Sequence, residues 1–435
     1  MNSGRDVRGK YAVIGAGPSG LAAAKNLLAQ GIACEVLEAH DTLGGIWNRS
    51  NPRSSVYATT HTITSKPVTA YPGFPLADEL PPYPRHDEIL PYLESFAAAY
   101  QLTDCIRFGQ DVVGVRPEED SSWRIETADG STRHYRGVII ANGHNWSPRY
   151  PTYPGQFAGE TLHSRDYDSP SIFDGKRVLV VGAGNSGCDI AVDAARHSDS
   201  VLVSMRRGYY FVPKFVFGKP VDQVGQNTQS TRLPIGLVRL GYRALLRVAF
   251  GYPTDYGLPA PDHRLLETPP IVNSLLPYYV AHGRVKPRPD IAALDGDKVE
   301  FVDGRVDAID VIVYATGFRL QLPFIDTRHL GWRDGRPDLF MMAMSRQHDN
   351  LFVAGLTDGT GGHFPTVDLQ TQVMARFIAG LDAGSPAARA LARRKATDHP
   401  DATGGIRFVD SPRSLTQFEL NTYVRQLRRQ LVALG

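Results

Sequence analysis

A glycine-rich turn near the N-terminus has the residue types that hold the phosphates of a dinucleotide. Residues 15–20 read GAGPSG, between the apolar run 11–14 and a helix-forming stretch. The first glycine permits a tight turn, the second lets the backbone approach a pyrophosphate, and the third lets helix and strand pack closely. The helix N-terminus adds free N–H groups and a positive dipole. The predicted cofactor-binding residues are Gly15, Gly17, Pro18, Ser19 and Gly20.

An acidic residue follows this turn at the distance expected for a ribose contact. Glu38 lies eighteen residues after Gly20, at the end of the next predicted strand, residues 33–37. A carboxylate at this place accepts hydrogen bonds from a ribose hydroxyl pair. It would repel a 2′-phosphate. The first turn therefore predicts a site for FAD.

A second turn of the same kind differs at this one position. Residues 182–187 read GAGNSG after the apolar run 177–181, and Arg206 and Arg207 stand where the acid stood before. The guanidinium fork binds phosphate oxygens with two hydrogen bonds, which suits a 2′-phosphate. We therefore predict an NADPH site made by Gly182, Gly184, Asn185, Ser186, Gly187, Arg206 and Arg207.

The elements that must position these turns are two strand–turn–helix–strand units. This repetition predicts an α/β fold with two Rossmann-like dinucleotide-binding domains, as in a two-dinucleotide-binding flavoprotein. We expect an FAD-binding domain from residues 1–168 and 315–435 and an NADPH-binding domain from residues 169–314. The latter carries an irregular and helical insertion at about 215–290, which is rich in proline.

The composition excludes several other classes of protein. The chain has 435 residues, with 47 Lys and Arg against 45 Asp and Glu, and this balance does not indicate a nucleic-acid partner. Its three cysteines are far apart, so we expect neither a disulfide framework, nor a metal site, nor a redox dithiol. The N-terminus is polar and no apolar run reaches eighteen residues, which predicts a cytoplasmic protein.

The segment before the second turn resembles the linking motif of the flavin-containing monooxygenases, FxGxxxHxxxY/W. It reads Phe157, Gly159, His163 and Tyr167 in this chain. The final tyrosine resembles the flavin-containing monooxygenases, whereas tryptophan would resemble typical Baeyer–Villiger enzymes. The resemblance places His163 and Tyr167 among the candidate catalytic residues, although a structural histidine at the domain junction is an equally good interpretation.

Three further motifs support this resemblance over nearly the whole chain. Gly45 and Trp47 belong to a GGxW segment that lies against the flavin in the family. Thr316 and Gly317 belong to its ATG motif, and residues 361–370, which end at Gln370, resemble the segment near the isoalloxazine. The resemblance implies that these five residues contact a cofactor.

The implied reaction is an FAD-dependent, NADPH-consuming monooxygenation of a small organic substrate. Reduced flavin would add O2 as a C4a-hydroperoxide, which passes one oxygen atom to a soft nitrogen or sulfur and needs no catalytic acid or base. Baeyer–Villiger oxygenation of a ketone is an alternative. An uncoupled NADPH oxidase that releases hydrogen peroxide is another.

One residue departs from the family pattern at the oxygen site. Many members carry an asparagine in a TNTSK-like segment, where its amide contacts the flavin. The matching segment here is TITSK, and Ile63 occupies the asparagine position, with His61 and Thr62 as nearby polar groups. This departure puts ordinary amine oxygenation in doubt but leaves flavin reduction intact.

The insertion is the expected source of substrate selectivity. Within it, residues 237–250 carry Arg239, Arg243 and Arg247 at a helical spacing of four. We favour a helix packed on the enzyme with a solvated arginine face over a helix that rests on a membrane. The sequence is compatible with an oligomer and does not specify one.

Overall fold

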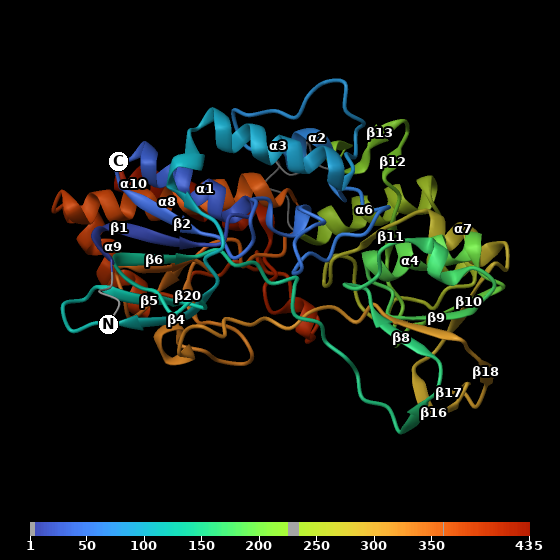
Figure 1. The fold of residues 1–435 in the computed structure, drawn as a ribbon. Helices are drawn as coiled ribbons and strands as arrows, with labels where there is room; N and C mark the ends of the chain where they lie inside the picture. Colours follow the sequence, from blue (N-terminus) through green and yellow to red (C-terminus); the bar gives the residue numbers. More distant parts are fainter. Residues whose placement is uncertain (1–4, 225–234, 360) are drawn as a thin grey trace.

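The computed structural model describes residues 5–224, 235–359 and 361–435, which form two lobes (Figure 1). The first lobe contains a nine-stranded sheet in the order β20-β21-β22-β6-β1-β2-β3, with β4 and β5 continuing from β6. Its strands are β1 (Arg5–Ile14), β2 (Cys34–Leu37), β3 (Ile106–Arg107), β4 (Val112–Pro117), β5 (Trp123–Thr127), β6 (Thr132–Ile140), β20 (Leu339–Phe340), β21 (Met344–Ser345) and β22 (Leu351–Val353).

The centre of this sheet is parallel and covered on both faces. β1 pairs in parallel with β2 and β6, and β22 pairs in parallel with β6. Ala12 and Val13 are fully buried, as expected for a short apolar strand between two layers. The helices of this lobe are α1 (Pro18–Ala29), α2 (Lys66–Thr69), α3 (His86–Ala99), α8 (His363–Asp382), α9 (Pro386–Thr397) and α10 (Leu420–Leu434).

The second lobe contains a parallel sheet in the order β15-β10-β9-β19-β8. Its strands are β8 (Glu160–His163), β9 (Arg177–Val181), β10 (Ser200–Ser204), β15 (Val285–Arg288) and β19 (Val311–Tyr314), and its helices include α4 (Asn185–His197) and α7 (Leu275–Ala281). A smaller sheet contains β7 (Gly155–Phe157), β16 (Ile291–Gly296), β17 (Lys298–Phe301) and β18 (Val306–Ala308). The predicted α/β fold with two Rossmann-like units is confirmed.

The strand pairing shifts the expected border between the two lobes. β7 pairs with β16 and β8 pairs with β19, so both strands lie in sheets of the second lobe although they precede residue 168. The pairing follows from the chain path, because residues 141–154 have already crossed between the lobes (Figure 1). We therefore propose to move the first border from residue 168 to before Gly155, and we keep the return near residue 315.

The insertion is smaller than the expected 215–290, because α7 and β15 belong to the second sheet and its cover. It contains β11 (Phe211–Val212), β12 (Phe215–Val216), β13 (Lys219–Pro220), α6 (Ile235–Ala249) and β14 (Ile271–Val272). Short 3₁₀ helices in the described parts of the chain span Gly45–Trp47, Leu102–Cys105, Pro170–Phe173, Pro253–Tyr256, Thr327–Leu330 and Pro412–Ser414.

Helix α6 packs on the enzyme as expected, and its exposed face carries two of the three predicted arginines, Arg243 and Arg247, beside apolar side chains. Leu246 is buried, and Arg239 turns inward to Glu267 at 3.5 Å. Leu237, Leu240 and Val248 are 54%, 65% and 79% exposed. No described helix is both long and apolar enough to cross a bilayer. Contact of this stripe with a membrane surface stays the less favoured alternative.

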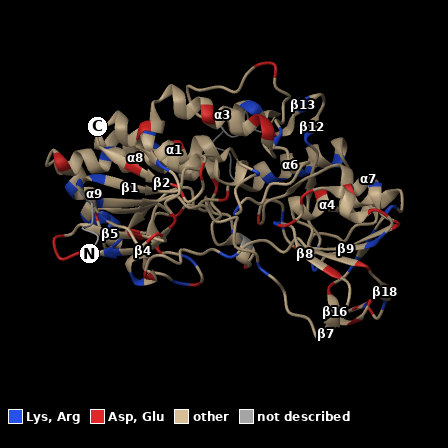
Figure 2. Cartoon of the chain, viewed as in Figure 1, with Lys and Arg blue, Asp and Glu red and all other residues tan. Residues whose placement is uncertain are grey.

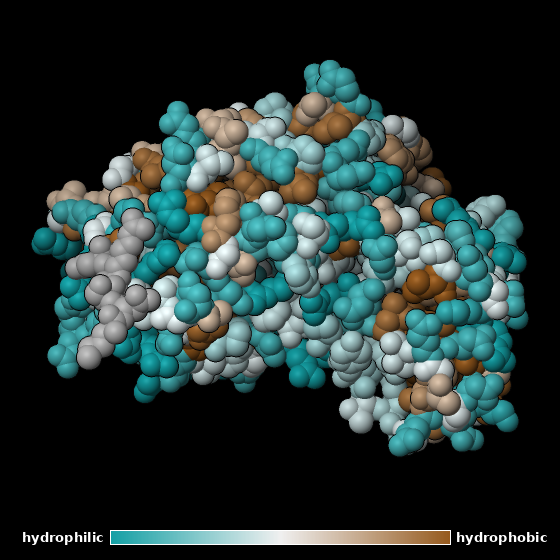
Figure 3. All heavy atoms as spheres, viewed as in Figure 1, coloured by the Kyte–Doolittle hydropathy of each residue, from teal (hydrophilic) through white to brown (hydrophobic). Residues whose placement is uncertain are grey.

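Basic and acidic residues are interspersed over both lobes (Figure 2), and hydrophilic side chains predominate on the face seen in Figure 3. Between α9 and α10 the chain forms a segment that we call the strap, residues 400–419. Val409 N–H donates to Glu267 O in the insertion, and Asp358 N–H donates to Thr416 O of the strap, each at 2.8 Å. The strap thus bridges the two lobes.

Candidate functional site

The first glycine turn has the geometry that a dinucleotide needs. Gly15 has a φ of +104°, and a Cβ on Gly20 would lie 1.8 Å from Gly15 O, so helix α1 approaches the turn more closely than any other residue would permit. Gly17 is the N-cap of α1, and no side chain caps this helix. The uncapped N-terminus leaves backbone donors for a pyrophosphate, so these residues fit FAD.

Glu38 lies where β2 ends and is almost fully buried. Its two carboxylate oxygens accept hydrogen bonds from Ala16 N–H at 2.6 Å and His40 N–H at 2.9 Å. These bonds hold the carboxylate beside the glycine turn, at the place predicted for a ribose contact. Trp47 packs edge-on against Phe364, with ring centroids 6.4 Å apart. The donors and acceptors around the first turn therefore suit an unphosphorylated nucleotide.

The second turn repeats this geometry with one difference. A Cβ on Gly187 would lie 2.1 Å from Gly182 O, as at the first turn, but a Cβ on Gly184 would meet nothing within 4 Å. Gly184 is the N-cap of α4, again without a side-chain cap. The space before Gly184 and the free helix N-terminus fit a second pyrophosphate.

The two predicted arginines lie at the end of β10 and both line the cavity described below. Arg207 lies 3.6 Å from Asp262. Arg206 is exposed, and among the described residues its side chain has no ion pair. The pair therefore offers one free guanidinium for a phosphate and one that a carboxylate partly neutralises.

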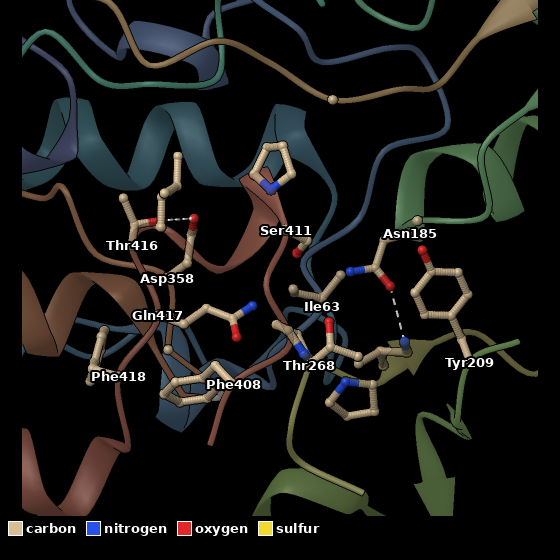
Figure 4. Close-up of a pocket in the computed structure, with 18 of the residues that line it drawn as sticks. Ile63, Asn185, Tyr209, Thr268, Asp358, Phe408, Ser411, Thr416, Gln417 and Phe418 are labelled. Carbon is tan, nitrogen blue, oxygen red and sulfur yellow. Dashed lines mark hydrogen bonds between the residues drawn. The ribbon is translucent and has the colours of Figure 1, made fainter. Parts of the chain in front are cut away.

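One large cavity joins the two lobes, with a volume of about 2090 Å³. It reaches the second glycine turn, Thr316 and Gly317 on one side, and Ile63, His144 and Asp358 on the other. Figure 4 shows Ile63 between the Asp358–Thr416 pair and Asn185, whose Oδ1 accepts from Val272 N–H at 3.0 Å. Residues of the first turn do not line this cavity. The strap forms part of its wall through Phe408, Ser411, Gln417 and Phe418.

The segment that carries Ile63 is fastened to the second lobe. Thr59 Oγ1 donates to Asp193 Oδ2 at 2.7 Å, and Ser65 N–H donates to Asp222 Oδ2 at 2.6 Å. Ile63 is 47% exposed and faces the cavity. Thr62 turns inward, and its buried hydroxyl has no hydrogen-bond partner in the described chain. His61 is exposed and its Nδ1 contacts Thr59 O. Neither neighbour brings an amide into the cavity beside Ile63.

His163 and Tyr167 are placed as structural residues and do not line the cavity. His163 is fully buried, its Nε2 lies 3.0 Å from Gly317 O, and its Nδ1 accepts from Arg165 N–H at 3.1 Å. Burial lowers the pKa of His163, so the ring is neutral. Tyr167 donates to Asp193 at 2.9 Å. Because their polar atoms are occupied, we propose that both residues position the lobes and do no chemistry.

We propose that Gln370 is also structural in this chain. It is fully buried, and its Oε1 accepts from Gly355 N–H at 2.9 Å while its Nε2 donates to Tyr423 Oη at 2.8 Å. Tyr423 in turn donates to Met341 O at 2.7 Å. These bonds join α8, α10 and the loop after β22. The amide therefore faces protein groups and not a cofactor.

We expect Gln370→Leu to lower the free energy of unfolding by about 3 kcal/mol, because Gly355 N–H and the Tyr423 hydroxyl would lose buried partners. Urea unfolding of the FAD-loaded enzyme measures this change. Gln372→Leu is the control, since Gln372 makes one bond to Asp368 at 2.7 Å and should cost under about 1 kcal/mol. Equal losses in the two variants would contradict the structural role of Gln370.

The sequence analysis missed a polar cluster in the cavity wall. His144 Nε2 lies 3.3 Å from Asp358 Oδ1, and Asp358 Oδ2 accepts from Thr416 Oγ1 at 2.6 Å. Burial favours the neutral forms of His144 and Asp358, but the attraction between their charges and the hydrogen bonds together have the larger effect. They raise the pKa of His144 and lower the pKa of Asp358. The two residues belong to no shared motif, since they are 214 positions apart.

A second histidine beside this pair is held neutral. Burial, and then the charge of His144, lower the pKa of His363 to about 4. Its Nε2 lies 3.2 Å from Ser19 Oγ. A histidine whose folded pKa is depressed contributes its full stability above the unfolded pKa of about 6.5, and this contribution is lost as the pH falls towards 4.

We therefore expect His363→Gln to remove about 2 kcal/mol of the stability that the enzyme loses between about pH 6.5 and 4. Chemical unfolding at several pH values, on the wild type and the variant, gives this difference. His282→Gln, at the exposed C-cap residue of α7, is the control and should leave the pH profile unchanged. An identical profile for His363→Gln would show that His363 takes up its proton in the folded enzyme as readily as in the unfolded chain.

The comparisons with known proteins agree with this geometry. Residues 8–433 match the family model described as FMO-like, flavin-binding monooxygenase-like. Flavin-containing monooxygenase 3 of Rattus norvegicus is 32% identical over 394 residues, which cover 85% of this chain and 74% of that protein. Dimethylaniline monooxygenase (N-oxide-forming) 2 of Oryctolagus cuniculus is 32% identical over 395 residues, 86% of this chain and 74% of that protein.

Solved structures share the fold. Cyclohexanone monooxygenase from Rhodococcus sp. Phi1 bound to NADP⁺ has a TM-score of 0.70 at 20% identity, covering 99% of this chain and 98% of that one. The flavin-containing monooxygenase from Stenotrophomonas maltophilia has a TM-score of 0.64 at 21% identity, covering 87% and 99%. The chain thus belongs to the flavin-binding monooxygenase-like family and is an NADPH-dependent flavoprotein monooxygenase that uses FAD.

Proposed function

We propose that this enzyme inserts one atom of O2 into a soft nitrogen or sulfur of a small apolar substrate. The observation that carries the proposal is the cavity of about 2090 Å³, which joins the NADPH turn to an apolar wall. That wall contains Val68, Val221, Tyr242, Phe408 and Phe418. Such a wall accepts an apolar molecule and excludes water from the site of oxygen transfer.

The chain and its cofactors have separate tasks in this proposal. Bound FAD, reduced by NADPH, supplies the oxygen-transfer chemistry. The two uncapped helix N-termini, at Gly17 and Gly184, bind the phosphates of the two nucleotides. Asp193 accepts hydrogen bonds from Thr59 and Tyr167 and so fastens the segment of Ile63 to α4. The protein therefore binds, orients and shields, and it places no acid or base at a reacting atom.

Product analysis tests this proposal. The enzyme is supplied with NADPH, O2 and, in separate reactions, an aryl methyl sulfide, a tertiary amine and a cyclic ketone. We expect sulfoxide or N-oxide in amounts comparable to the NADPH consumed. Ester or lactone from the ketone alone would replace the proposal with Baeyer–Villiger oxygenation.

An NADPH oxidase is the second candidate, and Ile63 is the observation that favours it. The isoleucine faces the cavity at the position where the family carries an amide donor, so nothing at that position can hydrogen-bond the flavin. Hydrogen peroxide equal to the NADPH consumed, with no oxygenated product from the three substrates, would establish this activity.

A further inference from the structure

Two stretches of chain cross between the lobes, and each carries an arginine that faces the cavity. Residues 141–154 leave the first lobe and residues 315–320 return to it. They pair side by side, since Arg149 N–H donates to Gly317 O at 3.0 Å and Arg319 N–H donates to Ser147 O at 2.8 Å. This pairing brings Arg149 and Arg319 together at the junction of the lobes, and both line the cavity.

Arg149 is fixed in place by the ATG segment. Its Nε and Nη2 donate to Thr316 O at 3.1 and 2.7 Å, and the Thr316 hydroxyl donates back to Arg149 O. The guanidinium is half-buried, and Nη1 is left for another acceptor. An arginine held in this way loses little conformational entropy when it binds a further group.

Arg206 and Arg319 are the other two arginines near Arg149. Within the residues that the structure describes, the side chains of Arg206 and Arg319 make no ion pair and no hydrogen bond. Asp290, a carboxylate of the same cavity, is engaged by Ile291 N–H at 3.0 Å and by the Tyr153 hydroxyl at 3.3 Å. The cluster therefore contains two cations, Arg206 and Arg319, that make no ion pair with a described carboxylate.

The electrostatic effect on Arg149 agrees with the placement of the three arginines in one cavity. Burial, and after it the positive charges of Arg206 and Arg319, lower the pKa of the Arg149 guanidinium. Like charges beside one another cost free energy unless an anion lies between them. The uncapped N-terminus of α4 opens into the same cavity and adds positive potential. The positive charge in this part of the cavity thus favours the binding of a multiply charged anion.

We propose that Arg149, Arg206 and Arg319 form one site that binds a phosphate group of NADPH. Arg206 comes from the nucleotide-binding unit itself, whereas Arg149 and Arg319 come from the two crossings. The 2′-phosphate and the pyrophosphate are the two phosphate groups that this cofactor offers. The proposal rests on the use of NADPH and not on the identity of the oxygen acceptor, so either proposal can fail alone.

Titration of the FAD-loaded enzyme with NADP⁺ and with NAD⁺, followed by calorimetry, tests the site. We expect Arg319→Gln to raise the Kd for NADP⁺ about tenfold and Arg149→Gln about thirtyfold, as for lost charge-assisted bonds. An unchanged Kd for NAD⁺ assigns the site to the 2′-phosphate. A Kd raised equally for both nucleotides assigns it to the pyrophosphate.

Arg428→Gln on α10 is the matched control, because it removes one positive charge from the wall of the same cavity. We expect its Kd for NADP⁺ to stay within twofold of the wild type. Arg319 has no side-chain partner to lose, so its variant remains informative if Arg149→Gln folds poorly. Wild-type affinity for NADP⁺ in Arg319→Gln, or an equal loss in Arg428→Gln, would overturn the proposal.

Discussion

Replacement of Gly184 by alanine should weaken the binding of NADPH about 100-fold while the protein stays folded. Gly184 has φ −72° and ψ 179°, which alanine adopts without strain, and an added Cβ would meet no protein atom within 4 Å. The methyl group would instead occupy the space through which a pyrophosphate must approach α4. We expect the Kd for NADPH to rise about 100-fold, equivalent to about 2.7 kcal/mol.

Three measurements separate this effect from a folding defect. The melting temperature and the FAD content of Gly184→Ala should match the wild type, and only the rate of flavin reduction at limiting NADPH should fall. Gly241→Ala, at a site on α6 where a Cβ also meets nothing within 4 Å, should leave the FAD content and the rate of flavin reduction unchanged and raise the melting temperature slightly, because alanine favours a helix more than glycine does. Wild-type NADPH affinity in Gly184→Ala would mean that the nucleotide does not approach this turn.

The sequence was sufficient for the parts of the fold that depend on local pattern. The apolar runs before Gly15 and Gly182 are the central strands β1 and β9. They could be recognised because a strand buried on both faces is a continuous apolar run without alternating polar residues. The close approach of helix to turn at Gly20 and Gly187 follows from the same motif. Both glycine turns and the α/β class could therefore be predicted.

Contacts between residues far apart in the chain could not be predicted from sequence patterns. The amide of Gln370 meets Gly355 and Tyr423, and no spacing in the sequence relates these residues. His144 and Asp358 come from different loops and meet only because their strands are neighbours in the sheet. Arg149 was overlooked because its role depends on where the chain crosses between lobes.

Family resemblance also placed among the catalytic candidates residues whose polar atoms already bond to other protein groups. The motif histidine, His163, has both ring nitrogens occupied, and the hydroxyl of Tyr167 is bonded to Asp193. A motif can mark a position that holds domains together as readily as one that reacts. Ile63 shows the opposite case, since a departure from the motif faces the cavity directly.

Substitution of Ile63 by asparagine should redirect oxygen from peroxide to product. Ile63 is about half exposed within the cavity, so a polar residue there costs little folding free energy. The new amide would supply the hydrogen-bond donor that the family places against the flavin. One such bond is worth about 1 kcal/mol, which corresponds to a fivefold rise in the ratio of oxygenated product to hydrogen peroxide.

Ile63→Leu is the control for this change, because leucine branches at Cγ as asparagine does but offers no donor. Peroxide release and product formation are measured together with the NADPH consumed, using the substrate that the wild type oxygenates best. We expect Ile63→Leu to keep the wild-type ratio. If Ile63→Asn and Ile63→Leu shift the ratio equally, the shape of the cavity, and not a missing amide, limits oxygen transfer. If neither variant shifts it, residue 63 lies too far from the flavin to influence the reaction, and the NADPH oxidase candidate loses its structural support.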